Sequence, residues 1–201
     1  MTLTRPLRLT LPLTLVLIAA LTALAPAERT LGGNLRLVLL HGAWVWSGKV
    51  LFAAAGLCGL AALIRPAGWA DWSRALAWSA LLFWVTYLPM SLLVQLQNWG
   101  GIFWDEPRWR IPFTFGVAAL LLQGGLAALN QPRLTGLANA AFGLALWLAL
   151  GGAENILHPQ SPVAQSGSPV IQLSFGLLLG LALLTGAQIA LLFRFPRRNA
   201  A

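Results

Sequence analysis

The chain has 201 residues, of which 58% are hydrophobic and only 9% are charged, and its mean hydropathy is +0.75. A soluble domain carries about 25% charged residues, so this composition argues against a soluble enzyme, a disordered chain or a nucleic-acid-binding domain. The net charge of +8 comes almost entirely from Arg residues that lie between apolar runs, which is typical of membrane topology. The single cysteine, Cys58, excludes a disulfide framework.

Long apolar runs predict membrane-spanning helices, because each crossing needs about 20 mostly apolar residues. Six runs are long enough, over residues 9–26, 37–64, 75–96, 111–129, 134–151 and 169–193. Open strands cannot satisfy their backbone in lipid, so we expect an all-α, polytopic membrane helix bundle that forms one domain over residues 1–201. The first run has an alternative interpretation as a signal peptide, since Ala25-Pro26-Ala27 resembles a cleavage site.

The positions of the Arg residues predict the orientation of this bundle. With six spans, both termini and the segments 65–74 and 130–133 lie on one side and carry eight Arg. The segments 27–36, 98–110 and 152–168 lie on the other side and carry four. Basic residues concentrate on the cytoplasmic side, so we expect both termini in the cytoplasm.

Polar and small residues within the spans indicate how the helices pack. Intramembrane amides are typical of hydrogen bonds between helices, and the chain places them at Gln95, Gln123, Gln172 and Gln188. Gly176 and Gly180, four residues apart, are typical either of a close helix contact or of a small-residue face inside the bundle.

Two features of the predicted outer side point to a ligand. The only histidines, His41 and His158, lie at the outer start of the second span and in the last outer loop. The segment 99–110 holds three Trp, one Phe, two acids and two Arg. An aromatic belt at the interface is the alternative explanation, but Gly and Pro breaks predict a shaped loop. Flat rings beside guanidinium groups suit a large planar anion, because Arg binds carboxylates bidentately.

Haem fits these features. Two neutral imidazoles hold an iron from opposite faces, indole rings cover the macrocycle and guanidinium groups pair with its propionates. An acid in the loop would orient a neighbour or hold the loop in shape. The candidate iron ligands are His41 and His158, the candidate covering rings are Trp99 and Trp104, the candidate propionate partners are Arg36 and Arg108, and the acids are Asp105 and Glu106. Alternatively, the two arginines reach phosphate headgroups at the membrane surface, and an acid pairs locally with Arg108 or Arg110.

These residues resemble the haem-handling proteins of cytochrome c biogenesis, most closely the cytochrome c maturation protein C family (CcmC). Members have six spans, a tryptophan-rich outer "WWD" segment between spans 3 and 4, and a histidine in each flanking outer loop. Three segments of this chain, 36–44, 99–108 and 155–158, resemble the corresponding family segments in the same order. Aligned without a gap, Glu106-Pro107-Arg108 lies at the family's acid-Pro-Arg position, while Asp105 stands where the family has its last Trp. A one-residue gap instead aligns Trp104-Asp105 with the family's Trp-Asp and displaces Arg108.

The resemblance implies that His41 and His158 hold haem b at the outer face of the bacterial cytoplasmic membrane. It also implies handover of the haem to a periplasmic haem chaperone, in association with subunits of an ABC transporter. We expect no nucleic-acid partner and no enzymatic activity, since the chain lacks a Ser/His/Asp set and a His-Glu-x-x-His motif. Two alternatives stay open: an exporter of haem or another amphiphile, and a structural membrane subunit without a ligand.

Overall fold

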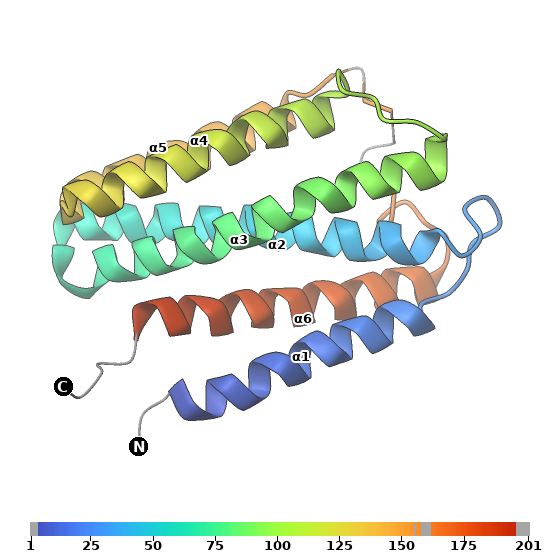
Figure 1. Cartoon of the computed structure of the whole chain (residues 1–201), viewed down its shortest axis with the longest axis horizontal. Helices are drawn as coiled ribbons and strands as arrows, with labels where there is room; N and C mark the ends of the chain where they lie inside the picture. Colours follow the sequence, from blue (N-terminus) through green and yellow to red (C-terminus); the bar gives the residue numbers. More distant parts are fainter. Residues whose placement is uncertain (1–3, 155, 158–161, 196–201) are drawn as a thin grey trace.

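The computed structural model describes residues 4–154, 156–157 and 162–195, and it shows a bundle of α-helices (Figure 1). The helices are α1 (Thr4–Leu24), α2 (Leu35–Ile64), α3 (Pro66–Trp99), α4 (Pro107–Leu129), α5 (Pro132–Gly151) and α6 (Pro169–Arg194). All six are long and apolar enough to cross a membrane. The predicted all-α, polytopic membrane fold is therefore confirmed, and each helix overlaps its predicted run, although α3 begins well before residue 75.

Proline sets the start of four of these helices, at Pro66, Pro107, Pro132 and Pro169. Its missing N–H costs nothing there, because the amides of the first helical turn have no partner within the helix. Residues in the left-handed conformation follow the ends of α3 and α4, namely Gly100 at φ +69° and Asn130 at φ +47°. Such residues terminate helices, so local sequence defines these boundaries.

The connection between α2 and α3 is shorter than the sequence predicts. We expect a loop over 65–74, but the non-helical backbone is confined to a tight turn at Arg65, Ala67 and Gly68. Pro66 starts α3 immediately, and Gly68 at φ +81° turns the backbone inside its first turn, so no longer loop is needed. Arg74 consequently lies on α3, where its guanidinium donates a 3.2 Å hydrogen bond to the Asn130 side chain.

The helices lie in three layers of two (Figure 1). The helices α2 and α3 form the middle layer, α4 and α5 cover one face, and α1 and α6 cover the other. A core of large side chains fills the middle of the bundle and includes the fully buried Trp84, whose Nε1 donates a 2.8 Å hydrogen bond to the Pro112 carbonyl. α1 packs mainly on α6, where Thr14 donates a 2.9 Å hydrogen bond to the Gln188 carboxamide oxygen.

A chain of buried polar side chains links four helices. Gln123 of α4 donates to the Asn139 side chain of α5 at 2.8 Å, and Asn139 donates to the Ser73 hydroxyl of α3 at 2.9 Å. The Ser73 hydroxyl donates in turn to the Ala55 carbonyl of α2 at 2.8 Å. Hydrogen bonds of this kind hold helices together in lipid, where burial of apolar surface does not. The predicted interhelical role is thus confirmed for Gln123 and Gln188.

The closest helix contact joins α2 to α5 and not the pair of glycines that the sequence singles out. A Cβ atom on Gly59 would meet the Gly136 backbone, and one on Gly136 would lie 2.6 Å from the Gly59 carbonyl oxygen. In contrast, a Cβ atom on Gly176 or Gly180 would meet nothing within 4 Å. The two backbones at Gly59 and Gly136 therefore approach as only glycines allow.

The start of α1 and the end of α6 lie at the same end of the bundle (Figure 1). The short connections 65 and 130–131 share that side, and the segments 25–34, 100–106, 152–154 and 162–168 lie at the opposite end of the bundle. This is the alternation that the sequence predicts for six spans. It brings the longest connections together at one end, which we call the loop-rich end.

We expect Gly59→Leu to destabilise the bundle, because a larger side chain would force α2 and α5 apart. Overpacking of this kind costs about 1–3 kcal/mol, and thermal unfolding in detergent should record a lower midpoint. Gly124→Leu is the matched control, since Gly124 of α4 has open space around its Cα. Equal midpoints for the two variants would contradict the close contact.

Candidate functional site

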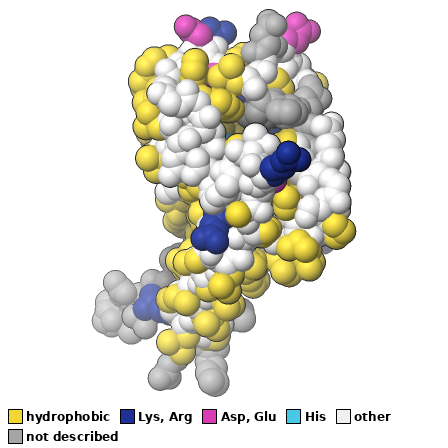
Figure 2. All heavy atoms as spheres, turned by 90° about the vertical axis from the view of Figure 1, so that its right-hand side faces the viewer, with side chains coloured by type: hydrophobic (Ala, Val, Ile, Leu, Met, Phe, Trp, Pro, Cys, Tyr) yellow, Lys and Arg dark blue, Asp and Glu magenta, His cyan; other side chains and the backbone are white. Residues whose placement is uncertain are grey.

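The loop-rich end carries most of the residues that the sequence singles out. Figure 2 shows this end of the molecule, where basic and acidic side chains lie on a surface that is otherwise partly hydrophobic. The described part includes His41, Arg36, Trp99, Trp104, Asp105, Glu106 and Arg108. The second predicted iron ligand, His158, lies outside the described residues, so its placement stays a prediction.

His41 is tied to the start of α4 through Tyr87. The half-buried His41 ring, two turns into α2, stacks on the Tyr87 ring of α3 with centroids 5.0 Å apart and planes 26° apart. The Tyr87 hydroxyl donates a 3.0 Å hydrogen bond to the Arg108 carbonyl. Tyr87 is 3% exposed, so the imidazole rests on a buried and fixed surface. His41 is thus linked to the segment 99–110 indirectly, through Tyr87.

The segment between α3 and α4 is a shaped loop, as predicted. Gly100 ends α3 in the left-handed conformation, and the buried Gln95 side chain accepts a 2.8 Å hydrogen bond from the Phe103 N–H. The loop therefore folds back over the last turn of α3. The buried side-chain amide of Gln95 thus fixes the backbone of the predicted outer loop.

Glu106 joins this loop to the segment that precedes His158. Glu106 is only 6% exposed and occupies the position just before α4, but its side chain does not cap that helix. Instead its Oε1 accepts a 3.1 Å hydrogen bond from the Leu157 N–H. A carboxylate is also favoured at a helix N-terminus, because the helix dipole is positive there. Glu106 thus holds the loop in shape, one of the roles that the sequence allows it.

Asp105 differs from its neighbour. Its side chain is fully exposed and lies 3.9 Å from Arg110, an ion pair in water that contributes little to stability. The structure therefore separates the two adjacent acids into a buried anchor and a surface residue.

The tryptophans of the segment 99–110 form an aromatic edge, in which exposed indole rings pack against other aromatic rings. Trp104 is 56% exposed and packs edge-on against Trp109, with centroids 4.9 Å apart. Trp109 is buried and stacks on Phe113 with planes 11° apart. Trp99 is 37% exposed and packs edge-on against Phe103. Two of the three indoles, Trp99 and Trp104, thus present surface at this end of the bundle.

The two candidate arginines lie apart. Arg108 is half-buried beside the Tyr87 contact at the start of α4. Arg36 lies on α2, and its Nε donates a 3.0 Å hydrogen bond to the Ala25 carbonyl at the end of α1. Five residues along an α-helix correspond to a rotation of about 140°, so Arg36 and His41 leave α2 on different faces. The structure brings the backbone of Arg108, but not Arg36, into contact with Tyr87 beside His41.

Sequence reasoning missed Tyr87 and the role of Gln95 in the loop. Both are buried on α3 and face the loop-rich end, where each binds a backbone group of the following segment. One signal for Tyr87 was present, since it is the only tyrosine in the chain. A polar ring in an otherwise apolar span requires a hydrogen-bond partner.

The fold and the site define a six-helix membrane protein with an aromatic, histidine-bearing end. Comparison with known proteins gives no match to any family model, curated protein or solved structure. Within the described ranges, no group of three or more His, Cys, Asp or Glu residues is placed to bind a metal ion. Functional inference therefore depends on the arrangement of the site itself.

We expect Glu106→Ala to loosen the segment 152–168, because it removes the acceptor for the Leu157 N–H. A hydrogen bond to a charged group contributes about 1.5–3 kcal/mol, so amide exchange in this segment should accelerate by roughly 10-fold or more. Hydrogen–deuterium exchange with mass spectrometry measures this effect. Glu106→Gln retains an oxygen acceptor and should fall between the wild type and Glu106→Ala.

Asp105→Ala is the matched control for this experiment, since Asp105 is the adjacent acid and is fully exposed. It should leave exchange in 152–168 unchanged. If Asp105→Ala and Glu106→Ala accelerate exchange equally, the anchoring role of Glu106 is wrong.

Proposed function

We propose that this protein binds haem b at the loop-rich end of the bundle and presents it for delivery to a haem chaperone in cytochrome c assembly. One arrangement supports the proposal above all. Tyr87 ties His41 to the start of α4, and Glu106 ties the same loop to Leu157, the residue before His158. The three segments that resemble the haem-handling family are thereby connected through described contacts.

The residues present are chemically suited to this group. His41 is an imidazole held on a buried ring, Trp104 is an exposed indole supported by a buried one, and Arg108 is a half-buried arginine whose backbone carbonyl binds the same Tyr87. Under this proposal His41 and His158 would hold the iron, while Trp99 and Trp104 would lie against the macrocycle. Haem would supply a planar, iron-bearing ligand with two carboxylates, and the chain would supply only binding and orientation.

The carboxylates of the ligand would be recognised near Arg108. Guanidinium groups bind carboxylates in bidentate geometry, and the backbone of Arg108 contacts the Tyr87 on which His41 stacks. Arg36, the other candidate, lies on a different face of α2 and is less well placed for a ligand of His41. Glu106 would act indirectly, as a positioning residue that fixes the loop.

Release is as important as binding for a delivery protein. Trp104 is more than half exposed, so one edge of the site is open to a partner protein. The Nε2 atom of His41 is shielded from solvent, so we expect the covering segments to shift when an iron binds. A ligand held between loops, rather than deep among the helices, suits transfer because it dissociates without opening the bundle.

The membrane orientation completes the proposal. The positive-inside rule applied to the Arg residues puts both termini in the cytoplasm and the loop-rich end on the periplasmic side of a bacterial cytoplasmic membrane. A periplasmic haem chaperone would then reach the site directly, and subunits of an ABC transporter would associate within the membrane.

The direct test is the visible spectrum of the chain purified in detergent after expression with haem supplied. We expect a Soret and α band typical of low-spin haem with two histidine ligands, because two imidazoles give a strong ligand field. His41→Ala and His158→Ala should each abolish the low-spin spectrum while the elution profile stays that of the folded protein. A folded wild-type protein that stays colourless would instead favour a structural subunit without a ligand.

The aromatic edge is tested separately. Trp104→Ala should weaken haem binding by about 2- to 10-fold, because it removes one ring contact of roughly 0.5–1.5 kcal/mol. Titration of haem into the purified apoprotein measures the change. Trp69→Ala is the control, since Trp69 is a comparably exposed tryptophan near the start of α3, at the opposite end of the bundle. An equal loss in the two variants would indicate a general effect on packing in the detergent micelle.

A further inference from the structure

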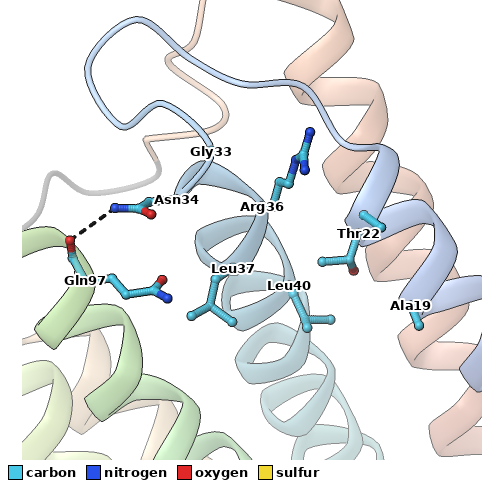
Figure 3. A pocket seen from close by; sticks show the side chains of 9 residues that line it. Ala19, Thr22, Gly33, Asn34, Arg36, Leu37, Leu40 and Gln97 are labelled. Carbon is cyan, nitrogen blue, oxygen red and sulfur yellow. Dashed lines mark hydrogen bonds between the residues drawn. The ribbon is translucent and has the colours of Figure 1, made fainter.

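A groove of about 430 Å³ opens over α2, between α1 and α3 (Figure 3). Its upper end is polar and its floor is apolar, which is the distribution expected for an amphiphile. The polar lining residues are Thr22, Asn34, Arg36 and Gln97, and the remaining lining residues are Ala19, Ala23, Gly33, Leu37 and Leu40.

At the polar end, one hydrogen bond holds the Arg36 guanidinium in place, and the rest of its donors are left for a ligand. Nε of Arg36 donates to the Ala25 carbonyl at 3.0 Å, while its two terminal nitrogens make no hydrogen bond or ion pair with any residue that the structure describes. The acid of the same loop, Glu28, is engaged elsewhere, since it accepts hydrogen bonds from the Leu31 and Thr30 N–H groups at 3.0 and 2.8 Å. These donors hold the pKa of Glu28 below its usual range.

The end of the groove is closed on the α3 side. The Asn34 side chain donates a 3.1 Å hydrogen bond to the Gln97 carbonyl, which joins the start of α2 to the end of α3 (Figure 3). The guanidinium of Arg36 projects toward α1 at the same level. A ligand headgroup would therefore lie between two fixed polar groups from α2, with its tail below them.

The apolar floor exists because α1 leaves this face of α2 open. α1 packs mainly on α6, and the small residues Ala19 and Ala23, one turn apart, face the groove. Leu37 and Leu40 of α2 form the floor of the groove, beside these alanines. Methyl groups and leucines on a lipid-facing surface suit an acyl chain, whereas they provide nothing for a free inorganic anion.

We propose that this groove binds an anionic phospholipid of the leaflet at the loop-rich end, with its phosphate on Arg36 and an acyl chain over Leu37 and Leu40. Charge complementarity favours this occupant, because a guanidinium pairs with phosphate in bidentate geometry. The site is separate from the proposed haem site, because Arg36 and His41 lie on different faces of α2.

Native mass spectrometry in detergent, with phosphatidylglycerol or phosphatidylcholine added, tests the proposal. We expect one retained phosphatidylglycerol on the wild type and weaker retention of phosphatidylcholine. Arg36→Ala should lower the affinity for phosphatidylglycerol by about 10-fold, because it removes a charge-assisted pair. Arg36→Lys should restore part of that loss. Arg110→Ala is the matched control, since Arg110 is another exposed arginine at the loop-rich end, and it should leave binding unchanged.

A second variant tests the acyl-chain part independently of charge. Ala19→Phe fills the floor of the groove from α1 and should also reduce retention of phosphatidylglycerol, with Arg36 intact. Unchanged retention in Arg36→Ala, or in Ala19→Phe, would overturn the proposal. So would displacement of the lipid by inorganic phosphate alone, which would assign the site to a free anion, or by haem, which would assign Arg36 to the haem carboxylates.

Discussion

Hydrogen bonds between buried side chains and the close approach of small residues determine this bundle, because lipid tails are as apolar as the helix surfaces that they cover. The helix α2 lies at the centre of these contacts. Its backbone meets α5 at Gly59 and Gly136, and its Ala55 carbonyl receives the chain of hydrogen bonds that runs through Ser73 and Asn139. Both sites described above depend on this fixed position of α2, since His41 and Arg36 project from its outer turns.

Side chains of α3, rather than contacts within the loops, hold the segments of the site at the loop-rich end in place. Two buried polar residues of α3 bind the backbone of the next segment, Gln95 at the Phe103 N–H and Tyr87 at the Arg108 carbonyl. Glu106 extends the same order to Leu157. A loop held at several points by buried groups has little conformational freedom left to lose on binding a ligand. This is the preorganisation that an aromatic and cationic binding site requires.

The sequence predicts the membrane fold well because apolar length is a direct physical requirement for crossing a bilayer. It fails where backbone geometry decides. The length of an apolar run says nothing about the turn at Gly68, so the prediction of a loop over 65–74 is wrong. Glycine spacing also misleads, because Gly176 and Gly180 lie in open space while the close contact uses Gly59 and Gly136 from different helices. Within the site, Glu106 was identifiable as a loop residue, but the stacking of His41 on Tyr87 required three-dimensional knowledge of two helices.

Helix geometry also explains how one element serves two chemical environments. Residues five apart differ by about 140° around the axis, so His41 faces α3 while Arg36 lies at a groove open to lipid. Both residues lie within the first two turns of α2, and the loop 25–34 connects that same end to α1. An occupant of the groove would therefore stabilise α1 against the start of α2 without contacting the imidazole. Because α2 is rigid and anchored below, a lipid at Arg36 would affect the orientation of α1 and the loop 25–34, whereas the position of His41 would still be set by Tyr87 and the polar chain beneath it.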